Sequence, residues 1–106
     1  MLVLSQTDND RTVCVRVGDT VRISLPENAS TGYRWTIERY DDEFLEALPA
    51  EAGYTSNSIG SGGEIAFMFF TKKVGTGQLV LKHWRHWEGD ASITKRFRLQ
   101  IQIQIQ

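Results

Sequence analysis

Three short segments hold residues that suit contact with another molecule better than the interior of a strand. They supply hydroxyl groups, bare glycine backbone, a guanidinium and an indole, and they read Asn28-Ala29-Ser30-Thr31-Gly32-Tyr33, Gly60-Ser61-Gly62-Gly63 and Arg85-His86-Trp87. Each lies between runs of alternating apolar residues, at intervals of about 25 to 32 residues, the spacing of every second connection in a multi-strand fold. In an up-and-down antiparallel arrangement such connections emerge at one end, where we expect the three loops to form a binding surface.

The first segment has the composition of a fixed turn. Asn28 can hydrogen-bond to backbone groups two residues on and so fix the start of the turn. Gly32 allows a positive φ without a Cβ penalty, which leaves Ser30 and Thr31 as the exposed crest. Tyr33 begins the strand that follows and would anchor the base of the loop in the core. A preordered loop loses little entropy on docking; an ordinary turn is the alternative.

The other two segments also allow a functional and a structural interpretation. A tryptophan beside an arginine, as in Trp87 and Arg85, is typical of interface hot spots, whereas Trp87 could instead fold back onto the end of the domain. The segment from Gly60 to Gly63 is either a hairpin connection or a loop whose bare backbone lets another protein approach. It does not match a phosphate-binding loop, because a strand pattern follows it and no Gly-Lys-Ser/Thr is present.

The sequence gives little support to an enzyme or a metal protein. Cys14 with His83 or His86 could make a thiol nucleophile and its base, but Cys14 lies in mid-strand, opposite in face to its valine neighbours, which favours a structural cysteine. His83 and His86 are three positions apart, which on a strand places them on opposite faces. No second histidine pair or cysteine pair completes a zinc set. We therefore expect a protein that is not an enzyme and that needs no cofactor or metal.

The composition is that of an ordinary globular protein and excludes several partners. The chain has 106 residues, a net charge of −1 and 24% charged residues. No basic stripe in the sequence indicates nucleic acid, and the longest apolar run, Ile65 to Phe70, is too short to span a membrane. Cys14, the single cysteine, allows no internal disulfide. The N-terminus shows no signal peptide, which leaves open a cytoplasmic protein or a mature periplasmic or secreted form.

Alternation of apolar and polar residues predicts the strands that position these loops. Residues 13–17, 21–25, 33–38 and 78–84 alternate, and so does the long segment from Ile93 to Ile105. Pro26 is expected to end the second of these strands, because it removes a ladder donor. Residues 64–71 are apolar on both faces, which predicts a central strand covered on both sides.

The segment from Tyr40 to Pro49 breaks this alternation and is predicted to be one helical turn or an irregular crossover. A short, weak strand is expected over residues 54–58. Together these elements predict an all-β fold, an immunoglobulin-like β-sandwich of about seven to eight strands, as a single domain over residues 1–106. The chain is expected to be a monomer.

In order and spacing, the three segments resemble the motifs of the chagasin-type inhibitors of cysteine peptidases. That family carries an Asn-Pro-Thr-Thr-Gly-aromatic loop, a Gly-x-Gly-Gly loop and an Arg-Pro-Trp/Phe loop, in the order in which the three segments occur here. Three departures stand out: Ala29 and His86 take the places of prolines, and Ser30 takes that of a threonine. Loss of the two prolines removes a restraint on φ from both loops.

The resemblance implies a reversible inhibitor of papain-like cysteine peptidases that occludes the active-site cleft with the three loops of an immunoglobulin-like sandwich. The loop with Thr31 would enter between the cysteine and the histidine of the peptidase. The glycine-rich loop would lie along one side, and Arg85 with Trp87 would pack on the other. The alternative is a non-inhibitory binding or adhesion module, for instance one that binds sugars through Trp87 and Tyr33.

Overall fold

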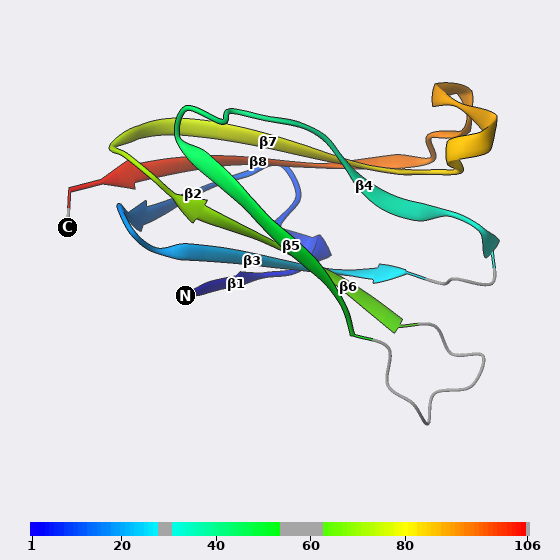
Figure 1. The fold of residues 1–106 in the computed structure, drawn as a ribbon, viewed down its shortest axis with the longest axis horizontal. Coiled ribbons are helices and arrows are strands. Elements are labelled where there is room, and N and C mark those ends of the chain that lie inside the picture. Colours follow the sequence, from blue (N-terminus) through cyan, green and yellow to red (C-terminus); the bar gives the residue numbers. More distant parts are fainter. Residues whose placement is uncertain (28–30, 54–62, 106) are drawn as a thin grey trace.

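Two four-stranded β-sheets pack face to face and enclose the core between them (Figure 1). The structure is a computed structural model, and it describes residues 1–27, 31–53 and 63–105 of the chain. Sheet A has the strand order β1 (Leu2–Leu4), β3 (Thr20–Glu27), β6 (Gly63–Thr71), β5 (Leu45–Gly53). Sheet B has the order β2 (Arg11–Arg16), β8 (Lys95–Gln104), β7 (Gly75–Trp84), β4 (Arg34–Tyr40). The eight-stranded, immunoglobulin-like sandwich that the sequence predicts is confirmed.

Three single 3-10 turns lie wholly within the described residues. These are η1 (Gln6–Asp8), η3 (His86–Glu88) and η4 (Asp90–Ser92). None of the helices in the described part of the chain has the length and apolarity needed to cross a membrane.

The alternation of the sequence places every second side chain in the core. In β3, Val21, Ile23 and Leu25 are fully buried, and in β8 the residues Phe97, Leu99, Ile101 and Ile103 are at most 3% exposed. Burial of each such side chain contributes roughly 1.5–3 kcal/mol to the stability of the folded state. The polar residues between them face solvent, so each sheet has one apolar and one hydrated face.

The register of the strands brings the flanks of three connections to the same end of the sandwich. Those flanks lie opposite one another in the sheets: Glu27 with Gly63, Gly53 with Glu64, and Arg34 with Trp84. Figure 1 shows these strand ends on the right of the molecule. The topology is not the simple up-and-down arrangement expected, because β1 pairs with β3 and β2 pairs with β8 in parallel. The three connections still lie at one end of the sandwich because the strands from β3 to β8 alternate in direction.

Residues 40–49 correct the sequence prediction in part. One turn forms, in which the Leu45 N–H donates to the Asp41 carbonyl at 3.0 Å, but β5 begins directly after it. Pro49 is tolerated in that strand because it falls at a shift of register between Leu48 and Glu51, where the ladder is interrupted. The weak strand expected over 54–58 lies outside the described residues.

Two smaller expectations were also wrong, and one strand was missed. β3 does not end at Pro26 but continues to Glu27; β1 ends opposite Ile23, so β3 has an open edge at Pro26, where a missing N–H costs no ladder bond. β6 is central in sheet A, but only one of its faces lies on the core, and Phe70 on the other is 37% exposed. The N-terminal strand β1 had no signal in the alternation, because it is only three residues long.

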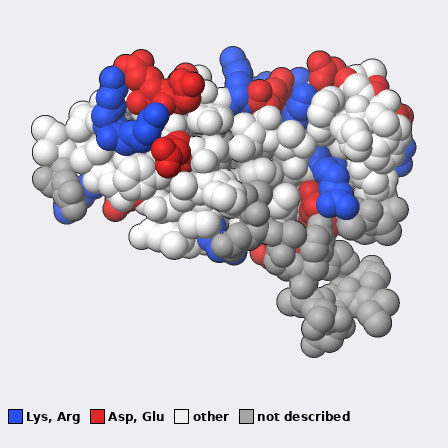
Figure 2. Space-filling model, in the orientation of Figure 1, with Lys and Arg blue, Asp and Glu red and all other residues white. Residues whose placement is uncertain are grey.

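Charged side chains lie at both ends of the sandwich. Figure 2 shows acidic and basic side chains gathered over the end that carries the β4–β5 and β6–β7 connections, and further charged side chains toward the other end. The first of these ends holds the Lys73–Glu43 ion pair. At the loop end the charges are paired as Arg85–Glu88, Lys82–Asp90 and Arg34–Glu27.

Candidate functional site

The structure brings two of the three predicted segments into direct contact. Residues Thr31 to Tyr33 lead into β4, and Arg85 to Trp87 leave β7 and enter η3. Gly63 is the first residue of β6 and lies opposite Glu27. The remaining predicted site residues lie outside the described part of the chain: Asn28, Ala29, Ser30, Gly60, Ser61 and Gly62.

The Arg85 guanidinium fixes the crest of the first segment. Its Nε and Nη2 atoms both donate to the carbonyl oxygen of Thr31, at 3.2 and 3.1 Å. Its Nη1 atom donates to Glu88 Oε1 at 2.9 Å, and this hydrogen bond raises the pKa of Arg85 above its ordinary value. Because a planar guanidinium donates in fixed directions, the three bonds hold both the arginine and the Thr31 peptide in one orientation.

Gly32 makes the second link between the segments. Its φ is +79°, a conformation that favours glycine. A Cβ atom at this position would lie 2.7 Å from Cη2 of Trp87, closer than side chains can approach. The indole therefore packs against the bare backbone of Gly32, yet it is still 62% exposed. The prediction of an exposed Trp87 is confirmed, and burial at the end of the sandwich is wrong.

Aromatic rings connect this crest to the core. The Arg85 guanidinium lies 4.3 Å from the centroid of the Tyr33 ring, in cation–π geometry. Tyr33 stacks on His83 with centroids 5.3 Å apart, and His83 contacts Trp35 at 5.1 Å. Trp35 is 4% exposed and belongs to the core cluster. The loop is thus supported from beneath by rigid rings.

Glu27 closes the base of the first segment from the side of β3. It is 2% exposed, and its Oε2 accepts a hydrogen bond from the Trp35 N–H at 2.9 Å. Its Oε1 lies 3.5 Å from Nη1 of Arg34. The Trp35 indole N–H donates to the Pro26 carbonyl at 3.1 Å. These contacts tie the strands on either side of the loop together, so the spacing of its two ends is set by a buried carboxylate.

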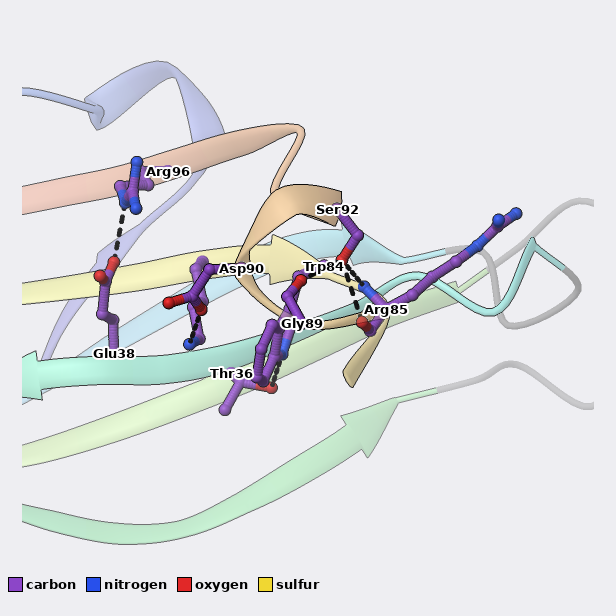
Figure 3. A network of polar contacts seen from close by, with 9 residues as sticks. Thr36, Glu38, Trp84, Arg85, Gly89, Asp90, Ser92 and Arg96 are labelled. Atoms are coloured by element: carbon purple, nitrogen blue, oxygen red, sulfur yellow. Dashed lines mark hydrogen bonds and ion pairs between the residues drawn. The ribbon is translucent and has the colours of Figure 1, made fainter. Parts of the chain in front are cut away.

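The third segment is held by a serine. Ser92 Oγ accepts a hydrogen bond from the Arg85 N–H at 3.0 Å, and its hydroxyl lies 2.9 Å from the Arg85 carbonyl and 2.7 Å from that of Gly89 (Figure 3). Figure 3 shows the Arg85 side chain extending from this anchored backbone away from the 3-10 turns. At its base, the Trp84 indole donates to Thr36 Oγ1 at 3.2 Å. The Arg85 backbone is thus fixed at one end and its guanidinium at the other.

Several residues of this arrangement had no sequence signal. Ser92 and His83 act through contacts with distant segments, and a polar residue at the end of a loop has no recognisable pattern. Glu27 had no signal either, because its burial at the last position of β3 depends on the Trp35 N–H, which reaches it from another strand. Arg85 was identified as a site residue, but its contact with Thr31 was not foreseen.

The chemistry of the site is that of binding. His83 Nδ1 lies 2.8 Å from Thr94 Oγ1, and burial, with Lys95 nearby, lowers the pKa of His83. The Cys14 thiol lies on the outer face of sheet B, 3.3 Å from Gln102 Oε1, at the opposite end of the β8 register from His83, because Cys14 pairs with Gln102 and His83 with Lys95. Among the described residues, no group of three His, Cys, Asp or Glu side chains could hold a metal ion.

Comparisons with known proteins agree with this interpretation. The sequence is 30% identical over 107 residues to chagasin of Trypanosoma cruzi, a match that covers 92% of this chain and 94% of chagasin. The fold matches that of a cysteine protease inhibitor of Entamoeba histolytica with a TM-score of 0.83 at 22% identity, over 97% and 94% of the two chains. It also matches PbICP-C, solved in complex with falcipain-2, with a TM-score of 0.73 at 15% identity, over 96% and 89%.

The family itself is identified by a family model that matches most of the chain. The model described as chagasin family peptidase inhibitor I42 matches residues 14–101, from β2 to the middle of β8. This range contains all three segments that the sequence singles out, and it includes both strands that hold the Arg85–Thr31 contact. The chain therefore belongs to the chagasin family of peptidase inhibitors, and it is an inhibitor rather than an enzyme.

Proposed function

We propose that the chain inhibits papain-like cysteine peptidases by inserting the loop end of the sandwich into the active-site cleft. Cysteine peptidase inhibition is the activity named for its structural relative from Entamoeba histolytica, and PbICP-C was captured with falcipain-2. In this proposal Thr31 enters between the catalytic cysteine and histidine, and Trp87 packs on one side of the cleft. The glycine-rich segment that ends at Gly63 lies along the other side.

The observation that carries the proposal is the double hydrogen bond from Arg85 to the Thr31 carbonyl. It joins the crest loop and the tryptophan loop before any partner is present. Since fixing loops on binding costs free energy, a surface whose loops are already joined retains more of its contact energy as affinity. This contact also compensates in part for Ala29 and His86, which lack the φ restraint of proline.

The geometry gives Arg85 and Trp87 different tasks. Arg85 is engaged by Thr31 and Glu88 and lies against Tyr33, so we assign it a positioning role rather than a contact with the peptidase. Trp87 is 62% exposed on η3, with its ring edge against the backbone of Gly32 and beside the His86 ring, so it supplies the apolar anchor.

The proposal also explains why the adhesion alternative is not favoured. A sugar-binding surface would need a row of exposed aromatic rings beside polar partners. Trp87 is exposed, but Tyr33 is covered by Arg85 on one face and by His83 on the other. Of the two aromatic residues that this alternative needs, only Trp87 has an accessible ring, so the described tip does not offer a row of aromatic rings.

Titration of papain with the purified chain tests the proposal. We expect reversible, competitive inhibition, and we expect Trp87→Ala to raise the inhibition constant about thirtyfold, the equivalent of about 2 kcal/mol for a lost hot-spot residue. Val74→Ala is the matched control, because Val74 is another large exposed apolar residue, 48% exposed, at the opposite end. No inhibition by the native chain, or equal inhibition by Trp87→Ala, would reject this site.

A further inference from the structure

Sheet B carries most of the positive charge of the molecule. Its four strands contain eight Lys and Arg residues and a single acidic residue, Glu38, although the whole chain has a net charge of −1. The strands of sheet A, by contrast, hold one basic residue, Arg22, and four acidic ones. No sequence stripe reveals this, because the basic residues are spread over four strands that come together only in the fold.

Some of these basic residues are already paired: Arg96 with Glu38 at 2.8 Å, and Lys82 with Asp90 at 3.3 Å. Four of these eight basic residues make no ion pair with an acidic group among the described residues: Arg16, Arg39, Lys95 and Arg98. Of the four, Arg39 and Arg98, both exposed, are the two that line a groove on this face, and a bound anion could neutralise them without breaking an ion pair.

The register places these two arginines on either side of one valine. Val80 of β7 lies opposite Arg39 of β4 and opposite Arg98 of β8, so the three form one row across the sheet. Strands lie about 4.8 Å apart, which puts the two arginine Cα atoms about 10 Å from each other, within reach of one anionic group. A shift of register in β4 between Ile37 and Arg39 turns both Glu38 and Arg39 to the outer face.

A groove runs over this row. It has a volume of about 210 Å³, and Val80, only 5% exposed, forms part of its floor. Beyond the arginines it is lined by neutral hydrogen-bonding side chains, Gln78, Gln100 and Thr12, which form the next row of the sheet. Asp10, also in the lining, is the acidic residue at its β2 edge.

We propose that this groove binds a segment of an acidic polysaccharide, with a sulfate or carboxylate group between Arg39 and Arg98. Amide and hydroxyl side chains such as Gln78, Gln100 and Thr12 both donate and accept hydrogen bonds, which suits sugar hydroxyls. The backbone of an acidic peptide also donates and accepts hydrogen bonds, so a peptide is the alternative that the experiment below tests. Single-stranded nucleic acid would need exposed aromatic rings along the groove, and the residues that line it include none.

The groove is separate from the loop end, so the inhibitor could bind a peptidase and the polysaccharide together. Its residues lie on the outer face of sheet B, and none of them belongs to the three loop segments. Such a surface would concentrate the inhibitor on an acidic polysaccharide without occupying the site that contacts the peptidase.

Binding of a heparin-derived hexasaccharide to the full chain, measured by calorimetry at low and physiological salt, tests the proposal. We expect saturable binding that weakens as salt rises, because the contacts are exposed and screened. The double variant Arg39→Gln/Arg98→Gln should weaken binding about tenfold or more. The control Lys72→Gln/Lys73→Gln makes the same change of charge at the β6–β7 connection and should change binding less than about twofold.

A variant that removes a negative charge, and should therefore tighten binding, makes the test independent of any damage to the fold. Asp10 has a φ of 64°, which asparagine also adopts readily, so Asp10→Asn removes the negative charge with little strain and should tighten binding. A hyaluronan hexasaccharide, which carries carboxylates alone, shows whether sulfate is required. Inhibition of papain should stay unchanged in all these variants, which separates this proposal from that for the loop end.

The opposite outcomes overturn the proposal. No binding by the native chain, or equal loss of binding in both double variants, would reject a site at Arg39 and Arg98. Equal or tighter binding of a glutamate hexapeptide or of a hexamer of thymidylate, with the same dependence on the two arginines, would replace the polysaccharide by a protein or a nucleic acid as the partner.

Discussion

Arg85 shows how one side chain can shape a binding surface without touching the partner. Its guanidinium joins the Thr31 carbonyl, Glu88 and the Tyr33 ring, so two segments of the loop end become a single unit. The family motif alone would suggest that a conspicuous arginine beside a tryptophan contacts the peptidase. The geometry instead makes it the support of the crest, and this difference has a measurable consequence.

Arg85→Lys should weaken inhibition although it keeps the charge. An ammonium group cannot replace a fork that donates to Thr31 and Glu88 at once, so the crest is no longer held in place before binding, and the inhibition constant should rise about tenfold. Thermal stability should change little, because these contacts lie at the tip of the sandwich and none of the three residues belongs to the core cluster. Arg96→Lys, which alters an arginine–glutamate pair away from the loop end, should inhibit as the native chain does; equal inhibition by Arg85→Lys would contradict the positioning role.

Gly32→Ala tests the contact between Gly32 and the Trp87 ring. The substitution requires a positive φ from alanine and places a Cβ 2.7 Å from the Trp87 ring, so the indole must move away from the crest. We expect a rise in the inhibition constant for papain, because the anchor loses its position. Gly18→Ala is the matched control, since Gly18 also has a positive φ, +94°, but nothing lies within 4 Å of its Cβ direction.

Comparison of the two variants should separate the effect of backbone strain from the effect of moving the Trp87 ring. Each costs about 1–2 kcal/mol through the left-handed conformation, which a thermal or urea unfolding curve will show. Gly18→Ala should keep full inhibition in spite of that loss of stability. If both variants inhibit equally well, the contact between Gly32 and Trp87 is not needed for function.

At the scale of elements, the loop end depends on how β4 and β7 pack at their tips. His83 of β7 lies between Tyr33 and Trp35 and contacts Thr94 at the start of the β8 segment. Burial is the main cause that lowers its pKa below the ordinary value of 6.5, and Lys95 adds to the effect. The neutral imidazole is thus the form that fits between these elements.

This predicts a dependence of stability on pH. As pH falls below about 6.5, histidine in the unfolded chain takes up a proton before His83 in the folded chain does, so unfolding becomes more favourable. The melting temperature of the native chain, relative to that of His83→Phe, should therefore fall between pH 7 and pH 5. Phenylalanine preserves the ring stack and cannot titrate, and His86→Phe, a change at the exposed tip, is the control for loss of a histidine. A constant difference across this range would show that His83 is not linked to folding.

At the scale of the whole molecule, the sandwich presents two separate surfaces. The loop end collects connections from both sheets, whereas the outer face of sheet B collects basic side chains from all four of its strands. A rigid core between them, with its central residues fully buried, keeps both surfaces in place.

Because a preformed end blocks the cleft without reacting, binding should not need the peptidase nucleophile. Papain with a carboxymethylated cysteine, or with that cysteine changed to alanine, should still bind with at most a modest change of affinity. Mass spectrometry after overnight incubation with active papain should show an intact chain, because a loop fixed by Arg85 and Glu27 does not align its carbonyl for attack. Cleavage next to Thr31, or loss of binding to the alanine enzyme, would indicate a substrate-like mechanism instead.

The sequence by itself determined the strands and the positions of the loops. Alternation is a local property, with a period of two residues, so β2, β3, β4, β7 and β8 could be recognised with no knowledge of their partners. The three segments stood out for the same reason, because glycine, asparagine and adjacent arginine and tryptophan residues interrupt that period. The position of the three loops at one end of the sandwich was predicted because every second connection of an antiparallel fold emerges at the same end. The two parallel strand pairs were not foreseen.

Only the tertiary structure decided what the individual side chains do. Arg85 meets a carbonyl 54 positions away in the sequence, and Arg39 and Arg98 share a row only through the pairing of β7 with both of their strands. Such contacts depend on register and on shifts like those in β4 and β5, which are set by packing across the whole core. A local pattern can place a residue in a strand or a loop, but its partner is fixed only when the distant segments meet.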